Sequence, residues 1–432
     1  MKQVKIALIL VNMFDGEHHD AMQPILFALI DELTPPGVSL SFFDERIKPL
    51  PEVIDAELIA LSVDTFSAAR AYALSKRFRA EGKTVVMGGI HPSSAPQEAL
   101  EQADAIVIGE AEDTWPKLVD DYRRGVLRAI YRSHEPPLSS FDPNHPALRS
   151  GYLPLGIMET SRGCPHRCDF CSVKVLYPQT VRRKPLAMVE QEIKANPHRW
   201  LFFVDDNLYS DQTYFLGLIR LLRKYRKRWA AQVSLEITND AQMLRMAKRS
   251  GAILLLIGLE SLADESLRQM GKRQNRQADL RQRVRRVQDH GILVYGTFVF
   301  GYAGDTPQSV KQVFDFGMEL GLSVLNFNPL QPMPGTPLYD RLLAQGRLSG
   351  DQWWLDPKYR YGALAFEPAS SGAEALSQAI ARARRDFYSP SNTFKRWLRQ
   401  AQPLRPSLCL IHCLLSHVSR REITRKQDRS FR

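Results

Sequence analysis

Two series of short apolar runs, each alternating with amphipathic stretches, constrain the fold of this 432-residue chain more than any other feature. In the first series the runs are typical of buried strands, and the stretches between them carry apolar residues at helical spacing. Strands that alternate with helices pair in parallel, so the pattern predicts an α/β fold with a doubly wound, Rossmann-like sheet. The predicted strands cover residues 4–10, 38–43, 58–63, 84–87 and 105–108, and two predicted helices cover 68–80 and 95–102.

A proline-rich segment, residues 132–153, separates the two series and predicts a linker between two domains. The second series contains six strand–helix units. Its predicted strands are 155–159, 201–204, 232–237, 253–259, 293–300 and 324–330, and its predicted helices are 186–194, 212–228, 241–249, 280–290 and 308–320.

Three of the five cysteines, Cys164, Cys168 and Cys171, form a Cys-x-x-x-Cys-x-x-Cys motif just after the first strand of the second series. Thiolates this close can hold one face of a cubane iron–sulfur cluster, because such clusters are bound by cysteine sulfur. A cubane has four irons, so one iron keeps an open site where a substrate can bind. The spacing therefore predicts a [4Fe–4S] cluster with a chemical role.

Two other interpretations of the motif need weighing. Zinc could be bound by the three cysteines and His166, although His166 lies two residues from Cys164 and from Cys168, where a short loop would struggle to close a tetrahedron. Disulfides fail on parity, since three cysteines cannot pair among themselves. We expect no secretory signal, so the cysteines indicate a reducing cytoplasm, where thiols serve metals or redox chemistry.

The cysteine motif, with Phe170 just before its last cysteine, resembles the signature of the radical S-adenosylmethionine (SAM) enzymes. The resemblance implies that residues 154–345 form a partial (β/α)6 barrel of the TIM type, with its chemistry at the carboxyl ends of the strands. It also implies that SAM chelates the open iron through its amino and carboxylate groups. An electron from the cluster would then cleave SAM to a 5′-deoxyadenosyl radical, and Phe170 would pack near the adenine.

Polar residues follow two strands of this predicted barrel. Asp205, Asp206 and Asn207 come after the second strand, and Gly258 and Glu260 end the fourth. In the family that the chain resembles, these positions orient SAM, whose ammonium and hydroxyl groups call for carboxylate and carbonyl acceptors. Helix capping is the alternative, since Asp and Asn are favoured there. We predict both segments as SAM contacts.

The amino-terminal region, predicted as one domain over residues 1–131, carries Gly-Gly-Ile-His-Pro at 88–92 and Ile-Gly-Glu-Ala-Glu-Asp-Thr-Trp-Pro at 108–116. Doubly wound sheets bind ligands beyond the carboxyl ends of their strands. Both segments resemble the cobalamin (B12)-binding domain that precedes the core of class B radical SAM enzymes. The Asp-x-His-x-x-Gly motif, through which other cobalamin proteins offer a histidine to cobalt, is absent from the sequence. The cobalamin contacts that the resemblance implies are Gly88, Gly89, His91, Gly109 and Glu110.

The net charge of +11 is concentrated at the carboxyl end, where residues 391–432 hold ten Lys or Arg against two Asp or Glu. Residues 346–400 resemble the helical extension of cobalamin-dependent radical SAM proteins, and residues 401–432 form a basic tail. An apolar stretch around Cys409 and Cys413 predicts an amphipathic helix on a protein or membrane surface. An auxiliary metal site formed by these two cysteines with His412 and His417 is the weaker alternative.

These features predict a cobalamin-dependent radical SAM enzyme that methylates an unactivated carbon of a small-molecule or lipid substrate. Its electron donor would be of the flavodoxin or ferredoxin type. Cyclisation or rearrangement without methyl transfer is the nearest alternative, and a cobalamin or metal sensor is the non-enzymatic one. An RNA-modifying methylthiotransferase is disfavoured, because residues 1–163 contain no cysteine for that family's second cluster, and nucleic acid is not an expected partner. We expect a cytoplasmic protein that can contact a membrane peripherally through its basic tail. No segment approaches the about 20 apolar residues needed to cross a bilayer.

Overall fold

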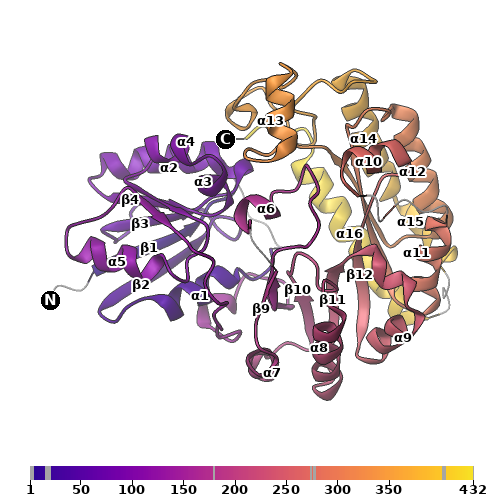
Figure 1. The fold of residues 1–432 in the computed structure, drawn as a ribbon, viewed down its shortest axis with the longest axis horizontal. Coiled ribbons are helices and arrows are strands. Elements are labelled where there is room, and N and C mark those ends of the chain that lie inside the picture. The colour runs from indigo at the N-terminus through magenta and orange to yellow at the C-terminus, as the bar shows by residue number, and fades with distance from the viewer. Residues whose placement is uncertain are drawn as a thin grey trace.

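Two parallel six-stranded sheets form the framework of the computed structural model, which describes residues 4–14, 21–178, 181–272, 275, 279–400 and 405–431 (Figure 1). The first sheet has the order β2-β1-β3-β4-β5-β6, so the chain changes direction between β1 and β3. Such a change of direction marks the crevice where doubly wound sheets bind ligands. The predicted strands of this sheet are confirmed as β1 Val4–Leu10, β2 Val38–Asp44, β3 Leu58–Ser62, β4 Thr84–Gly88 and β5 Ala105–Ile108.

Helices cover both faces of the first sheet, because successive strand residues point to opposite sides. Leu8 packs in the layer that includes residues of α1 and α5, whereas Ile9 packs in the layer that includes residues of α2 and α4. The bounds of these helices are α1 Ile25–Leu33, α5 Trp115–Arg123, α2 Ala68–Ala80 and α4 Pro96–Glu101.

The edge strand β6, Ile130–Arg132, is not predicted by the sequence. It pairs in parallel with β5 and buries only its middle residue, Tyr131, so its three residues give no apolar run. The linker that follows buries Leu138, Phe141 and Leu148 and contains one short 3-10 helix, Pro146–Leu148. Its prolines exclude longer elements.

The second sheet has the order β14-β13-β12-β11-β10-β7, and all its strand pairs are parallel. Six strand–helix units in this order confirm the partial barrel. Its strands are β7 Gly156–Met158, β10 Trp200–Phe203, β11 Arg228–Val233, β12 Ala252–Glu260, β13 Leu293–Phe300 and β14 Val324–Pro329. Its outer helices are α7 Leu186–Ala195, α8 Gln212–Lys224, α9 Ala241–Arg249, α11 Leu280–Asp289 and α12 Pro307–Leu320.

The predicted third barrel strand, 232–237, is wrong. The helix before it ends at Lys224 because Arg226 adopts a left-handed conformation with a φ of 51°. The strand therefore starts at Arg228, and its buried side chains alternate with less buried ones. A buried 3-10 helix, Leu235–Asn239, extends the apolar run beyond the strand, which is why the sequence places the strand too late.

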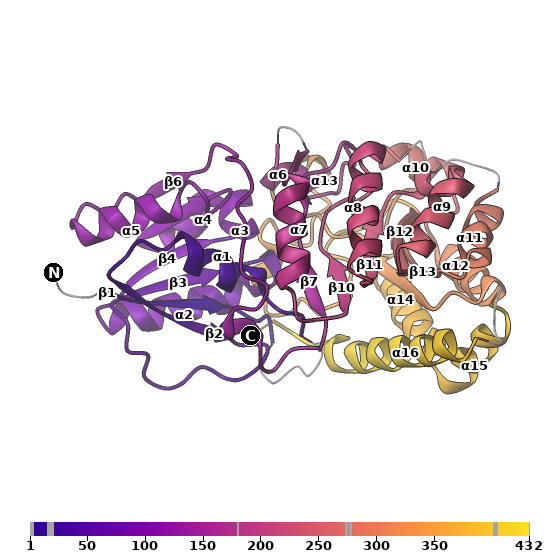
Figure 2. The same cartoon turned by 90° about the horizontal axis from the view of Figure 1, so that it is seen from below.

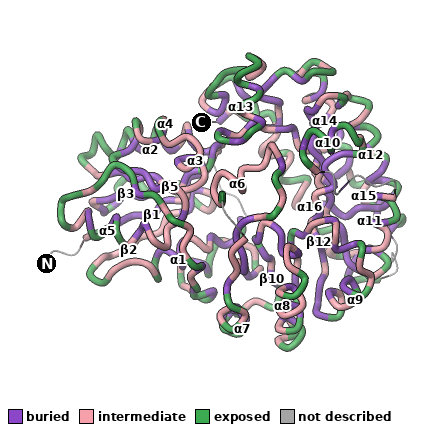
Figure 3. The backbone as a smooth tube through the Cα atoms, viewed as in Figure 1, coloured by how far each residue is buried: buried purple, intermediate pink, exposed green. Residues whose placement is uncertain are grey.

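The carboxyl-terminal part of the chain packs against both sheets. Two 3-10 residues, Trp353 and Trp354, join the core of the first sheet, whereas Leu408 of α16 packs on Leu254 and Leu293 near the amino ends of β12 and β13. Figure 2 shows α16 along one edge of the molecule, and Figure 3 shows the buried strands inside the more exposed helices. Within the described residues, no helix is both long and apolar enough to span a membrane. The helices of this part are α13 Pro337–Ala344, α14 Ala373–Phe387, α15 Pro390–Leu398 and α16 Pro406–Lys426.

His412 of α16 lies fully buried against α15. Its Nδ1 is 2.6 Å from the amide nitrogen of Gln400, and its Nε2 is 3.1 Å from the carbonyl oxygen of Thr393. Burial, together with the nearby Arg396 guanidinium, lowers the pKa of His412 to about 4. An imidazole in the unfolded chain has a pKa of about 6.5, so unfolding takes up a proton between these two pH values.

We expect this uptake to lower the free energy of unfolding by up to about 3 kcal/mol as the pH falls from about 6.5 to about 4. The variant His412→Gln keeps a hydrogen-bonding side chain but cannot ionise. Urea unfolding across this pH range should therefore show the wild type losing stability relative to His412→Gln. His417→Gln, on an exposed position of the same helix, is the control and should follow the wild type. Parallel pH profiles for wild type and His412→Gln would contradict the assignment.

Candidate active site between the two sheets

Asp205 anchors the start of residues 160–173, which hold the three cysteines of the motif and are called the cysteine loop. Its carboxylate accepts hydrogen bonds from the Thr160 backbone N–H at 3.1 Å and from the Thr160 and Ser161 hydroxyls at 2.6 Å each. The side chain is buried, and burial raises its pKa to about 6. With its oxygens already accepting from the loop, Asp205 supports the site rather than facing a ligand.

Of the next two residues, Asp206 binds the cysteine loop and Asn207 binds the barrel. Asp206 accepts a hydrogen bond at 2.8 Å from the backbone N–H of Gly163, the residue before Cys164. Asn207 is buried, and its side-chain oxygen accepts from the backbone N–H groups of Tyr209 and Ser234. Of the three residues predicted as SAM contacts after the second barrel strand, Asp206 lies near the thiols, where its charge adds to burial in raising the pKa of Cys164 and Cys171.

The end of the loop is held by Asp169, which the sequence does not single out. Its carboxylate accepts hydrogen bonds from the Tyr302 hydroxyl and, at 2.6 Å, from the Arg341 guanidinium. Its backbone carbonyl accepts from the N–H of Leu338. Phe170, the next residue, is partly buried and packs against the barrel core. The loop is therefore fixed at both ends by groups that follow barrel strands.

The three thiols lie in a partly desolvated environment. Burial raises the pKa of Cys164, Cys168 and Cys171, that of Cys168 to about 12. Iron binds thiolates, so metal binding would displace these protons. In the described part of the chain, no three His, Cys, Asp or Glu side chains converge on the position of one metal ion. The loop nevertheless fits a cubane, because a cubane spreads three cysteines over three different irons.

A charged pair lies beside the thiols at the end of β12. Lys272 Nζ is 3.0 Å from Glu260 Oε1. Burial alone would lower the pKa of Lys272, but Glu260 and the Cys168 thiol raise it above its ordinary value. Glu260 has a left-handed φ of 67°, and a side chain at Gly258 would approach its Oε1 to 2.3 Å. Gly258 and Glu260 thus lie side by side at the end of β12, and their contact with SAM stays a prediction. Lys272 comes from a later loop and carries no motif in the sequence.

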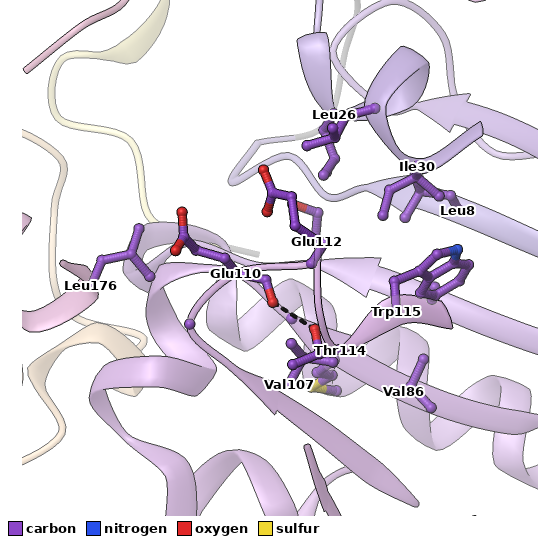
Figure 4. Close-up of a pocket in the computed structure, with 18 of the residues that line it drawn as sticks. Leu8, Leu26, Ile30, Val86, Val107, Glu110, Glu112, Thr114, Trp115 and Leu176 are labelled. Atoms are coloured by element: carbon purple, nitrogen blue, oxygen red, sulfur yellow. Dashed lines mark hydrogen bonds between the residues drawn. The ribbon is translucent and has the colours of Figure 1, made fainter. Parts of the chain in front are cut away.

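A cavity of about 200 Å³ opens at the carboxyl ends of the strands of the first sheet (Figure 4). Both domains line it, because Arg162 and Tyr177 of the second domain close one side. Its deeper wall is apolar and includes Leu8, Leu26, Ile30, Val86, Val107 and Trp115. The predicted cobalamin contacts that line it are Gly88, Gly89, Gly109 and Glu110.

Two glycines let the chain turn tightly at this cavity. Gly89 has a φ of 110°, and a Cβ there would come within 2.7 Å of the Val63 carbonyl oxygen. Gly109 has a φ of 90°, and a Cβ there would come within 2.9 Å of the Ser133 side chain. An L side chain is strained at such a φ, so both positions require glycine.

Arg162 joins this cavity to the cysteine loop. Its guanidinium lies 2.6 Å from Glu110 Oε1, 2.7 Å from Glu112 Oε1 and 2.9 Å from Glu159 Oε2. Burial raises the pKa of Glu112, and its second oxygen, Oε2, is buried without a hydrogen-bond partner among the described residues. Because Glu112 lines the cavity, this oxygen can accept a hydrogen bond from a ligand.

His91, predicted as a cobalamin contact, does not line the cavity. Its ring is fully buried and lies 2.9 Å from the Tyr72 hydroxyl and 3.1 Å from Glu98 Oε1. Trp354 donates a hydrogen bond to the same carboxylate oxygen. The backbone turn that shapes the cavity directs this side chain to the other face of the sheet, where we assign it a structural role.

The residues of the cavity fit one arm of cobalamin. Sites that enclose a whole small ligand measure roughly 300–1,000 Å³, so a cavity of about 200 Å³ suits part of a larger molecule. Cobalamin carries a nucleotide arm with an apolar bicyclic base, which the apolar wall could surround. The corrin ring carries amide groups, and their N–H donors match the buried carboxylate oxygen Oε2 of Glu112.

Family models match both halves of the chain. The model of the radical SAM superfamily matches residues 158–317, and the model of the B12 binding domain matches residues 40–119. These ranges include the cysteine loop and most of the residues around the cavity.

Relatives and solved structures extend the similarity to nearly the whole chain. Bacteriochlorophyllide d C-12(1)-methyltransferase of Chlorobaculum tepidum is 29% identical over 88% of this chain and 85% of its own. Hopanoid C-2 methylase of Rhodopseudomonas palustris is 25% identical over 76% of this chain and 66% of its own. The cobalamin-dependent SAM radical enzyme OxsB shares the fold with a TM-score of 0.70, 13% identity and coverage of 98% of this chain and 72% of its own. The radical SAM methyltransferase TsrM of Kitasatospora setae does so with a TM-score of 0.66, 17% identity and coverage of 99% of both chains.

Filling the cavity with a larger side chain tests whether it binds cobalamin. Leu26, half-buried on α1, lines the cavity, so Leu26→Trp adds an indole where we expect the cobalamin arm. Overpacking of this kind costs about 1–3 kcal/mol, so the dissociation constant for cobalamin should rise about ten-fold or more. Equilibrium dialysis against cobalamin measures it. Ile25→Trp, at the neighbouring half-buried position of α1, does not line the cavity and should bind as the wild type does. Equal binding by both variants would contradict the assignment.

Removal of the Lys272 charge tests whether SAM binds beside the cysteine loop. SAM carries a carboxylate at its methionine end, and a hydrogen bond to a charged group contributes about 1.5–3 kcal/mol. We therefore expect Lys272→Met to raise the KM for SAM about ten-fold or more and to leave the iron content unchanged. Initial rates of SAM cleavage at varied SAM, with iron assayed on the same samples, measure both quantities.

The control for this prediction is Lys224→Met, which breaks an ion pair of 2.6 Å with Glu190 on the outer helices. It should change neither the KM for SAM nor the iron content. An unchanged KM in Lys272→Met would remove Lys272 from SAM binding, and a loss of iron would make its role structural.

Proposed function

Because the chain is a cobalamin-binding member of the radical SAM superfamily, we propose that it transfers a methyl group to an unactivated carbon of a small, largely apolar molecule. Its cofactors are a [4Fe–4S] cluster, SAM and cobalamin. When bound, the cluster supplies an electron that cleaves SAM to a radical able to remove a hydrogen atom, and cobalamin supplies the methyl group.

One observation carries this proposal: ion pairs join the cysteine loop directly to the cavity of the first domain. Arg162 lies two residues before Cys164 and pairs with Glu110 and Glu112, which line the cavity of the first domain. A methyl donor and a radical generator must act on the same carbon, so their sites must be adjacent and fixed. The pairing of Arg162 meets this requirement.

The protein's own groups position the cofactors. Cys164, Cys168 and Cys171 would hold the cluster in a loop that Asp205 and Asp169 fix at its two ends. Asp206 lies beside the loop, where its free carboxylate oxygen could accept from the ammonium group of SAM. Across the loop, Lys272 would face the SAM carboxylate and Glu260 the ribose hydroxyls or the methionine end.

The choice of a carbon methylation rests on the relatives. The bacteriochlorophyllide d methyltransferase and the hopanoid C-2 methylase are named for methyl transfer to carbon positions of a tetrapyrrole and of a polycyclic lipid. Both molecules are large in apolar area. We propose a substrate of this chemical character, and a flavodoxin- or ferredoxin-type protein of the cytoplasm as the electron donor.

A second candidate function is oxidative ring closure without methyl transfer. It is favoured by the anaerobic magnesium-protoporphyrin IX monomethyl ester cyclase of Rubrivivax gelatinosus, which is 24% identical over 79% of this chain and 67% of its own. The two functions differ in the mass of the product. Methylation adds one methylene unit, whereas ring closure removes hydrogen.

SAM cleavage by the reconstituted protein tests the radical step. After anaerobic reconstitution with iron, sulfide and cobalamin, reduction in the presence of SAM should release 5′-deoxyadenosine. Changing Cys164, Cys168 and Cys171 together to Ala should lower this release at least a hundred-fold and remove the cluster absorbance, because no other thiolates are near enough to replace them.

The matched control changes Cys409 and Cys413, which lie on α16, to Ala. It should retain the cluster and the rate. Cluster absorbance that survives in the triple variant, or the absence of 5′-deoxyadenosine from the wild type, would overturn the proposed chemistry. Product masses from a tetrapyrrole or polycyclic lipid then decide between methylation and ring closure.

A further inference from the structure

Four large apolar side chains point to solvent on α15 and α16, and we call this region the α15–α16 face. Figure 2 shows the two helices together along one edge of the molecule, and a hydrogen bond from Arg396 to Ser416 joins them. The four residues lie one helical turn apart in each pair, so each pair forms a short stripe. Their exposed fractions are 57% for Phe394, 53% for Leu398, 71% for Leu410 and 58% for Leu414.

α16 has apolar residues on two sides, unlike an ordinary surface helix, which turns one apolar stripe to the core and its polar residues to water. Leu408, Ile411 and Leu415 pack inward against the barrel, whereas Leu410 and Leu414 face outward. Removing apolar surface from water is favourable, so the outward stripe favours a further apolar contact.

Cations surround this stripe. Arg405 stands directly before α16, and Lys395 and Arg399 are exposed on or next to α15. Burial, with Arg405 and Arg228 nearby, lowers the pKa of Lys248 to about 8, so Arg405 lies close to two further cations. Within the described residues, no carboxylate forms an ion pair with Lys395, Arg399 or Arg405.

The charge of the region as a whole has the same sign. Residues 391–432 hold ten Lys or Arg against two Asp or Glu. Beyond Leu414 the outward face of α16 continues into Arg420 and Arg421, which are exposed. An apolar stripe with cations on both sides matches a surface that is apolar inside and anionic outside.

We propose that the α15–α16 face docks on the surface of an anionic phospholipid bilayer. Phe394, Leu398, Leu410 and Leu414 would enter the boundary between headgroups and acyl chains, and the surrounding lysine and arginine side chains would bind lipid phosphates. The inner sides of both helices pack against the rest of the protein, so the helices cannot enter further. The protein would therefore lie on the membrane and not span it.

The position of this face is compatible with activity. Leu408, on the same helix, packs near the amino ends of β12 and β13, whereas the cysteine loop follows the carboxyl end of β7. Parallel strands place these two ends on opposite sides of the barrel. Docking would therefore leave the mouth of the site open to the electron donor.

Vesicle flotation of the full-length protein tests the proposal without any measurement of activity. The protein should float with vesicles of phosphatidylcholine and phosphatidylglycerol and much less with phosphatidylcholine alone. Added salt should weaken binding, because it screens the attraction between exposed charges. The double variant Leu410→Ser with Leu414→Ser should lower the bound fraction at least ten-fold, and Arg399→Ala with Arg405→Ala should remove the preference for phosphatidylglycerol.

The control is Val53→Ser, which changes an apolar residue that is 80% exposed in the first domain and should bind as the wild type does. Urea unfolding confirms that each variant remains folded. Equal flotation of the wild type and the double leucine variant would overturn the proposal. So would an absence of flotation together with a dimer that the leucine variant dissociates, because a second copy of the chain would then cover the face.

Discussion

The buried ion pairs of Arg162 hold the two halves of the site together. Burial alone would lower the pKa of this guanidinium, but Glu159 and Glu112 raise it well above its ordinary value, so the charge is retained. A buried charge is costly when a partner is removed, and here its partners come from both domains. The first domain therefore cannot move away from the cysteine loop without exposing Arg162 and separating Glu110 and Glu112 from it, and Glu110 from Arg182 as well.

The cysteine loop depends on side chains because it has little regular structure of its own. Between β7 and α6, Val173–Leu176, it contains only the two-residue strand β8, Ser161–Arg162. Buried carboxylates supply the missing hydrogen bonds, with Asp205 at the start of the loop and Asp169 at its end. Side chains fixed in this way hold a loop to within fractions of an ångström. Three cysteines that bind one cluster require such precision.

The sequence predicts the limits of several strands and the edge of the sheet at which their ends meet, because hydrophobic periodicity and strand order determine both. The limits of β13, Leu293–Phe300, are predicted correctly, and Gly89 and Glu110 meet at one cavity because parallel strands end at the same edge. It does not predict where a side chain points. Asp205 and His91 follow strands as ligand-binding residues do, but both are buried in hydrogen bonds to the protein. Lys272 is missed because a loop far along the chain brings it to the cysteines.

A second contact between the domains complements Arg162. Trp354, from the segment after the barrel, donates a hydrogen bond at 3.0 Å to Glu98 of the first domain. Farther along, Phe431 lies with its ring 6.0 Å from that of Phe14, beyond the end of α16. The two domains are thus joined on one side by ion pairs and on another by aromatic packing. Because the domains are joined at two places, neither contact can act as a pivot for rotation. The cavity that both domains line can therefore keep one shape while its ligand reacts.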